Sequence, residues 1–461
     1  MILMAAIASM TVVDAMADDY STAGNGTTWT LTRLADTDGT GVTREGNVFT
    51  LSNTVVVADG DHFELEGGIT IQLEKGVSLE VDGSASMAPA ERTLVTRSGD
   101  GVVPGIVYLR CENNLTFVKN VDFEYAGLKY YGSKGLCVDN CTFRYHEASM
   151  SNGSSALSIA GEGALFNISN CTFERNKRAA IGGAGNATNP TTIENCRFAY
   201  NDQQNLNYPQ LNLTASSSII VRNNVVTGDR DMTRGGGVMV ADLLSVASDP
   251  YTLIENNNVT DNRYGIALYA AQKAVVRNNM LLNNDTETEP NNGGSGINVY
   301  DPTGKQRTTI TGNHIEGHLW GVTIIGGADI NLGKTADPEA EDYNPGLNTF
   351  YNNGNSGMVY DLYNNSSNTV YAQGNYWKTA ATQDEQGIED VIFHKHDNSA
   401  LGEVIFMPFA TEETVGIVTS EAVHGAVDTQ VYTLSGARVN ALQRGLNIVR
   451  NGQETLKLMR R

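Results

Sequence analysis

A short pattern of apolar and polar positions recurs along the middle of the chain. Each copy reads apolar, any residue, Asn, then Asn or Cys, any residue, apolar, as in Val138–Phe143 and Val276–Leu281. The copies alternate and are rich in Val, Ile and Phe, which favours strands over helices. Their third positions are residues 140, 170, 195, 223, 256 and 278. Weaker copies flank them with third positions at 120 and 312, so the steps from 120 to 312 are 20, 30, 25, 28, 33, 22 and 34. Repeats of this length predict a solenoid.

A second apolar run follows many copies after a polar turn. In the later repeats these runs are residues 265–269, 296–300, 321–325 and 357–360. No segment between the copies keeps the three- and four-residue apolar spacing of an amphipathic helix. Two or three short strands per repeat, with Gly and Asn at the corners, predict an all-β parallel β-helix. Its coils should stack at the strand spacing of about 4.8 Å.

The repeated Asn and Cys positions have structural explanations. Asn tolerates left-handed backbone angles at a sharp corner, and stacked amides can form a hydrogen-bonded ladder. Cys141, Cys171 and Cys196 share one position in consecutive repeats and should form a column. We expect small buried thiols there, and a disulfide between adjacent coils stays open.

With these repeats the chain resembles right-handed parallel β-helix proteins, a group that includes pectate-lyase-like and NosD-like proteins. The resemblance covers about residues 45 to 410. It implies a right-handed solenoid with a cap over its first coil and a closing segment after its last. It does not imply one activity, because this fold serves lyases, hydrolases, epimerases and adhesins.

The ends of the chain carry different signals. Residues 1–17 are apolar and end in an A-x-A pattern, which predicts a signal peptide, and residues 18–45 follow as a lead-in. The solenoid should then occupy residues 46–410, and residues 411–461 a linker and a small β tail. The tail resembles the C-terminal sorting domain of type IX secretion in Bacteroidota, with Arg460 and Arg461 as its final basic pair. This resemblance implies contact with the secretion machinery and a secreted or cell-surface location, with the periplasm as the fallback.

Charge narrows the range of partners. The formal net charge is −21, which argues against nucleic-acid binding. An anionic polysaccharide would need a bridging cation or a local basic patch to approach such a surface. Nothing after the N-terminal segment approaches a transmembrane span, and we expect a monomer.

Alignment of the repeats predicts a stripe of turn residues along one edge. The stripe lies three and four residues after the last apolar position of each copy, and its members should stack because the coils stack. It contains His146, Glu147, Asn176, Lys177, Asn201, Asp202, Asp229, Arg230, Asn262, Arg263, Asn284, Asp285, His318 and Leu319, with neighbours Arg178, Asp231, Arg234, Tyr264 and Trp320.

The mixture of charges suggests a polysaccharide lyase. Such an enzyme neutralises a uronate carboxylate and abstracts the C5 proton. The β-helix resemblance implies an Arg or Lys base and Ca²⁺ held by carboxylates. The candidate catalytic residues are Lys177, Arg230, Arg263 and Asp202, and the candidate Ca²⁺ ligands are Asp202, Asp229 and Asp231. The candidate substrate-binding residues are Arg178, Arg234, Tyr264, Asp285, His318 and Trp320.

Other functions fit the same residues. A hydrolase could use Asp202 and Asp231 as its two carboxylates. A glycan-binding or adhesive face without catalysis would instead use aromatic side chains, for which the candidates are Tyr269, Tyr300, Trp320, Tyr360 and Tyr363. The segment His394–Asp397 could suggest a metal site, although a solvated turn explains it more simply.

Overall fold

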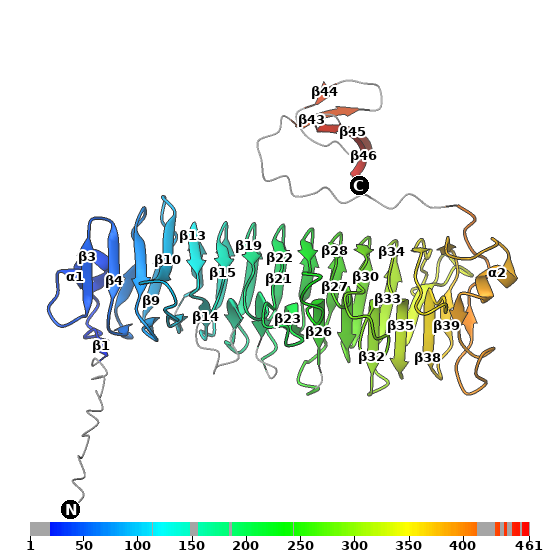
Figure 1. Ribbon diagram of the computed structural model, residues 1–461, viewed down its shortest axis with the longest axis horizontal. Coiled ribbons are helices and arrows are strands. Elements are labelled where there is room, and N and C mark those ends of the chain that lie inside the picture. The colour runs from blue at the N-terminus through cyan, green and yellow to red at the C-terminus, as the bar shows by residue number, and fades with distance from the viewer. Residues whose placement is uncertain are drawn as a thin grey trace, which may run out of the picture.

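The computed structural model describes residues 19–112, 114–147, 155–183, 187–242, 244–412, 429–433, 438–439, 445–451 and 454–460. The expected signal peptide lies outside the described residues. The described residues between 20 and 405 form an all-β solenoid of three sheets with fourteen strands each, which confirms the predicted fold class (Figure 1). All sheet pairings in the solenoid are parallel except β3 with β4.

The three sheets run along the solenoid and each coil contributes a strand to each. Sheet I contains β1 (Tyr20–Ser21), β5 (Val55–Val57), β8 (Leu79–Val81), β11 (Val107–Leu109), β14 (Leu128–Tyr130), β17 (Leu157–Ile159), β20 (Ile181–Gly183), β23 (Pro209–Thr214), β26 (Gly236–Ala241), β29 (Ile266–Tyr269), β32 (Ser295–Asp301), β35 (Trp320–Gly326), β38 (Leu362–Ser366) and β41 (Ile392–Phe393). Sheet II contains β2 (Thr28–Trp29), β6 (His62–Glu64), β9 (Ser84–Met87), β12 (Thr116–Lys119), β15 (Gly135–Asp139), β18 (Leu165–Ser169), β21 (Thr191–Glu194), β24 (Ile219–Arg222), β27 (Thr252–Glu255), β30 (Lys273–Arg277), β33 (Arg307–Thr311), β36 (Asp329–Gly333), β39 (Val370–Ala372) and β42 (Val404–Ile405). Sheet III contains β3 (Val42–Glu45), β4 (Val48–Leu51), β7 (Thr70–Leu73), β10 (Thr93–Arg97), β13 (Val121–Glu124), β16 (Thr142–Arg144), β19 (Thr172–Glu174), β22 (Arg197–Ala199), β25 (Val225–Thr227), β28 (Asn258–Thr260), β31 (Met280–Leu282), β34 (His314–Glu316), β37 (Thr349–Tyr351) and β40 (Tyr376–Trp377).

The repeated Asn marks the corner between sheets II and III. Asn120, Asn140, Asn170, Asn195, Asn223, Asn256 and Asn278 all have φ between 52° and 58°. This left-handed region costs other non-glycine residues roughly 1–2 kcal/mol. The predicted corner role of the Asn is therefore confirmed.

The main amide ladder lies one position later than the corner Asn. The side chains of Asn224, Asn257, Asn279, Asn313, Asn348 and Asn375 donate from one to the next over 2.8–3.0 Å. These residues are buried, because the residue after a left-handed corner points into the coil. In earlier coils Cys141, Cys171 and Cys196 occupy this position as buried free thiols, as expected.

The interior of the solenoid is made of columns of like side chains. Phe123, Phe143, Phe173 and Phe198 stack with centroids 4.7–5.0 Å apart. Alternation along each strand places one set of residues in this core and the other on the outer face.

The two ends of the solenoid are covered. Residues expected as an irregular lead-in already form β1 and β2, which pair with β5 and β6, and helix α1 (Leu31–Ala35) packs beside them. At the other end Trp377 stacks on Phe350, and helix α2 (Glu385–Glu389) follows. The strand expected at 357–360 lies instead at 362–366, because Asn355 and Met358 close a tight turn through two backbone hydrogen bonds.

The C-terminal tail forms its own antiparallel sheet. Its strands are β43 (Thr429–Thr433), β44 (Arg438–Val439), β45 (Gly445–Asn451) and β46 (Glu454–Arg460), in the order β44-β43-β45-β46. Helices α1 and α2 have five residues each, so the described chain contains no helix that could reach across a bilayer.

Candidate functional site

A groove runs along the outer face of sheet I in the second half of the solenoid. Its floor is one row of outward positions that pair in register from β23 to β38. This row contains Asn212, Met239, Ala267, Asn298, Thr323 and Tyr363. Five strand steps of about 4.8 Å make the row about 24 Å long. The groove has a volume of about 730 Å³.

The turns that lead from sheet III into sheet I form one wall of the groove. They contribute Asn207, Tyr208, Arg263, Tyr264 and residues 290–293, and Trp320 joins them as the first residue of β35. The second outward row of sheet I adds Tyr269, Tyr300, Ile325 and Asn365. The insertion at residues 283–294 lies between β31 and β32 and reaches the groove.

Aromatic side chains dominate one end of the groove. Trp320 lies 4.9 Å from Tyr363 and stacks on Tyr360 at 5.9 Å between ring centroids. The Trp320 indole donates to the Pro290 carbonyl over 2.9 Å, so its ring is fixed. Tyr269 and Tyr300 meet edge to face at 5.5 Å. The structure thus gathers the aromatic residues that the sequence suggested for a glycan-binding face.

Arg263 is the one charged side chain among the described residues that line the groove. Its Nε donates to the Asn292 carbonyl over 2.6 Å, its Nη2 donates to the same carbonyl, and its Nη1 donates to Asn207 Oδ1. In the described chain Arg263 forms no ion pair with a carboxylate. Its positive charge is therefore held by neutral acceptors and stays uncompensated within the groove.

The tyrosines beside Arg263 are poor proton acceptors. Burial raises the pKa of the Tyr264 hydroxyl strongly and that of Tyr269 less, and the positive charge of Arg263 offsets only part of this effect. Among the described lining residues there is no His, Lys, Asp or Glu. The groove therefore presents donors, amides and aromatic faces rather than a general base poised near neutral pH.

His318 lies in the core and not in the groove. Its Nδ1 accepts from the Asn284 backbone N–H over 3.1 Å, and its Nε2 donates to the Leu281 carbonyl over 3.1 Å. Burial lowers its pKa to about 3, so the ring is neutral. The expected stripe is thus not a single outward column. Most of its first positions point inward and, together with Gln210 from β23, form a second buried ladder, which contains Asn176, Asn201, Gln210, Asn262, Asn284 and His318. The first-position Asp229 is instead partly exposed, and the second-position Asp202 is buried.

The remaining basic candidates lie outside the groove lining. Lys177 pairs with Glu147 at 3.2 Å. Arg230 bridges Asp261 at 2.9 Å and Asp285 at 3.0 Å.

Two further arginines of the stripe lie close to the groove wall or to its turns. The Arg178 guanidinium lies 5.3 Å from the ring centroid of Tyr208, which lines the groove. The backbone N–H of Arg234 donates to Asn205 Oδ1 over 2.8 Å. Of the predicted site residues, the structure brings Arg263, Tyr264 and Trp320 together in the groove.

The three candidate Ca²⁺ ligands do not converge. The Asp202 carboxylate accepts from the backbone N–H groups of Leu206 and Tyr208 over 3.2 and 3.1 Å, and burial raises its pKa. Asp229 accepts from Gln203 Nε2 over 3.0 Å and from the backbone of Asp231 over 3.1 Å. The carboxylates of Asp202 and Asp229 serve as turn acceptors, and in the described chain none of the three belongs to a group of converging ligand atoms.

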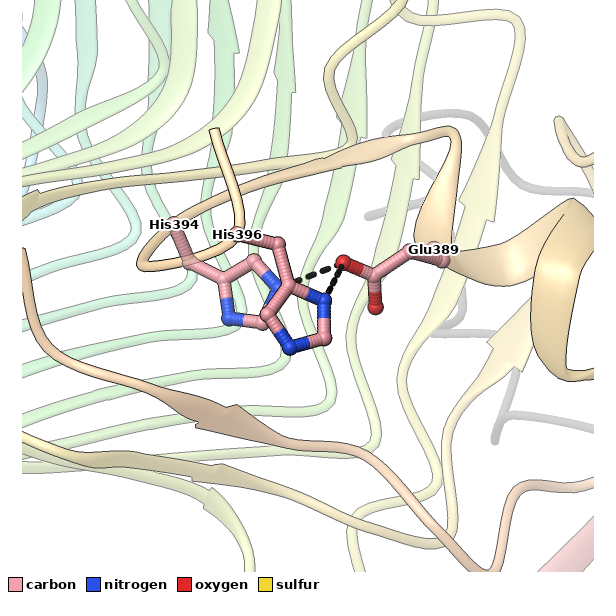
Figure 2. Close-up of side chains that lie close together, drawn as sticks. All are labelled: Glu389, His394 and His396. Atoms are coloured by element: carbon pink, nitrogen blue, oxygen red, sulfur yellow. Dashed lines mark hydrogen bonds and ion pairs between the residues drawn. The ribbon is translucent and has the colours of Figure 1, made fainter. Parts of the chain in front are cut away.

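A different set of side chains does converge, near the C-terminal end of the solenoid (Figure 2). Within the described residues, Glu389, His394 and His396 bring their ligand atoms within 4.8 Å of one another. His394 Nε2 and His396 Nδ1 lie 2.7 and 2.6 Å from the same oxygen, Glu389 Oε1. His394 is buried, so the expectation of a solvated turn is wrong for this residue.

Proton accounting at His394 disfavours a metal. The Val404 backbone N–H donates to His394 Nδ1 over 2.8 Å, so the proton of the neutral ring sits on Nε2 and points at Glu389. A histidine that binds a metal through Nε2 carries its proton on Nδ1 and donates it to an acceptor. Here Nδ1 faces a donor. The three side chains therefore form a hydrogen-bonded clamp between α2 and the segment before β42.

Comparison with known proteins agrees on the fold. The family described as the right-handed β-helix region matches residues 104–243. The fold is that of a right-handed parallel β-helix. No curated protein matches the sequence significantly.

Solved structures of two epimerases align with most of the chain. A structure of the periplasmic alginate epimerase AlgG aligns with a TM-score of 0.46 and 10% identity, over 82% of this chain and 83% of the other. The A-module of the Azotobacter vinelandii mannuronan C-5 epimerase AlgE4 aligns with a TM-score of 0.34 and 12% identity, over 81% and 88%.

Proposed function

We propose that this protein binds a polysaccharide chain in the groove on sheet I. The observation that carries the proposal is the lining itself: six aromatic side chains, several amides and one cation line a groove about 24 Å long. Ligand sites combine such apolar and aromatic walls with a few placed polar groups. Aromatic faces suit the C–H faces of sugar rings, and amides suit their hydroxyls. The length suits an oligomer better than a single sugar.

The charge of the groove favours a glycan that carries acidic groups. A guanidinium has five N–H donors, and three of those of Arg263 already bond to neutral acceptors. The other two can bind a carboxylate, such as that of a uronate, in a charge-assisted pair. No carboxylate among the described lining residues opposes this, although the protein as a whole carries a net charge of −21.

Binding without cleavage is the function that this groove supports best. Lyase-type β-elimination is the second candidate, and the observation in its favour is the cation beside Tyr264 and Tyr269. The raised pKa of both hydroxyls works against it, since neither is a ready base at neutral pH. Hydrolysis would need two carboxylates facing the sugar, and the described lining contains none.

A binding assay with matched variants tests the proposal. Purified protein is titrated calorimetrically with uronate polymers and with a neutral glucan, each with and without Ca²⁺, and the products are checked for the absorbance of unsaturated sugars. We expect binding of uronate polymers without new absorbance, and its loss in Arg263→Gln and in Trp320→Ala. Tyr251→Ala, which removes an exposed aromatic residue preceding a strand of sheet II, should bind like the wild type. Wild-type affinity in Arg263→Gln and in Trp320→Ala, as in the Tyr251→Ala control, would overturn the proposal.

We further propose that the protein is exported and that its β tail is a sorting signal for secretion. The support is the predicted signal peptide, the tail's resemblance to a sorting domain and its four-stranded sheet. Deletion of residues 411–461 should leave glycan binding intact and should stop delivery to the cell surface. Normal delivery of the truncated protein would refute the role of the tail.

A further inference from the structure

Residues 286–294 form a strap that contributes to the wall of the groove. The strap links β31 to β32, and its start is tied down because Thr286 Oγ1 donates to the Thr233 carbonyl over 3.0 Å. At its end, the Gly294 N–H donates to the Arg263 carbonyl over 2.7 Å, and the Gly294 carbonyl accepts from the Trp320 N–H over 3.0 Å. One residue of the strap thus joins the backbones of the two residues that dominate the groove.

The strap also holds the two side chains. Its Asn292 carbonyl accepts from Nε and Nη2 of Arg263, and its Pro290 carbonyl accepts from the Trp320 indole. Both side chains are therefore fixed before a ligand arrives. The Asn292 carbonyl occupies one edge of the guanidinium, so it also decides which donors remain for a ligand.

Gly293 provides the space that this arrangement needs. A Cβ added to Gly293 would lie 2.8 Å from Cγ of Arg263 and 3.0 Å from its Nε. Such contacts are too short, so the arginine side chain would have to move. No left-handed backbone angle is involved at Gly293, which makes Gly293→Ala a change of packing against Arg263 and little else.

We propose that the strap is a positioning element that sets the groove's affinity for acidic glycans. The proposal rests on the glycan-binding function proposed above. Gly293 and the carbonyls of Pro290 and Asn292 act through Arg263 and Trp320 and need not touch the ligand. Fixing rotamer-rich side chains in advance strengthens binding, because their ordering no longer has to accompany it. Loss of this order at Arg263 should weaken binding roughly tenfold.

The test compares Gly293→Ala with Gly99→Ala in the full chain. Gly99 has open space around it, with its nearest contact at 3.8 Å from Val102, so it controls for the general effect of Gly→Ala. The readouts are the Kd for a uronate polymer, the Kd for a neutral glucan and the thermal midpoint. We expect Gly293→Ala to bind the acidic polymer roughly tenfold more weakly, with the thermal midpoint unchanged and with a smaller effect on the neutral glucan. A purely structural role would lower the midpoint and weaken both ligands alike.

A second variant keeps the test open if Gly293→Ala folds poorly. Pro290→Gly keeps the carbonyl that holds Trp320 but loosens the strap backbone. It should weaken binding and change the fluorescence of Trp320, which is partly exposed, whereas the other two tryptophans, Trp29 and Trp377, are buried. Wild-type affinity in both strap variants, with affinity lost in Arg263→Gln, would overturn the positioning role of the strap. It would leave the proposed glycan binding in the groove intact. Wild-type affinity in Arg263→Gln as well would instead overturn the proposed function.

Discussion

Replacing Asp361 by Asn should stabilise the protein, and increasingly so as pH rises. Asp361 precedes β38 and is fully buried. One carboxyl oxygen accepts from Asn353 Nδ2 and from Thr379 Oγ1, both over 2.8 Å, whereas the other has no hydrogen-bond partner in the described chain. Burial raises its pKa to about 7, because the charged form would be desolvated without a cation nearby.

The magnitude follows from the difference between folded and unfolded pKa values. The unfolded carboxyl titrates near 3.8. The folded state binds this proton more tightly than the unfolded state does. The contribution of Asp361 to the free energy of unfolding is therefore fully present below pH 4 and falls as pH rises to 7. At about 1.4 kcal/mol per pKa unit, the loss is about 2 kcal/mol at pH 5.5 and about 4 kcal/mol at pH 8. Asparagine keeps the shape and the accepting oxygen but cannot ionise, so it escapes this loss.

Urea unfolding of wild type and Asp361→Asn between pH 5.5 and pH 8 measures the effect, since this range stays above the pI near 4.7. The free-energy gap should favour the variant and widen by about 2 kcal/mol across the range. Asp337→Asn, in an exposed insertion, is the control and should show no such gap. A gap that is constant with pH, or that favours the wild type, would refute the reasoning.

Three other predictions test the fold. Asp61→Asn should destabilise the N-terminal cap by about 2 kcal/mol at pH 7. Burial alone would raise the pKa of Asp61, but hydrogen bonds from Thr22, Thr27, Gly24 and Trp29 lower it to about 2. The stability that Asp61 contributes should be lost as pH falls from 3.8 through 2, which urea unfolding followed by Trp29 fluorescence measures. Asn257→Ala should cost about 2–3 kcal/mol by leaving ladder partners unsatisfied, and an unchanged urea midpoint would contradict this. Neither zinc nor a chelator should move the thermal midpoint, because His394 Nδ1 accepts from the Val404 N–H and its proton is therefore on Nε2, where a metal would bind. A rise of several degrees with zinc would contradict this assignment of the proton.

Much of the candidate site could not be predicted from the repeat alone. The stripe correctly included Arg263 and, as a neighbour, Trp320, but it also contained His318, which is buried in a ladder. In sequence both kinds of residue follow the last apolar position of a repeat by three to five positions. Whether a turn side chain points inward or outward depends on the local backbone, since a one-position difference reverses the direction. Gln210 makes the same point: it comes from β23, yet it fills a gap in the ladder between Asn201 and Asn262.

The sequence by itself determined the solenoid. The spacing of the repeat, the strand chemistry and the Asn corners depend on short-range geometry, which any copy of the pattern reveals. Only the tertiary structure decided where a ligand could bind. Arg263, Pro290, Asn292 and Trp320 are spread over 58 positions of the chain, and they meet because consecutive coils stack a few ångströms apart. The insertion between β31 and β32 has no repeat to predict its path, so its contacts with Arg263 and Trp320 emerge only when the coils are assembled.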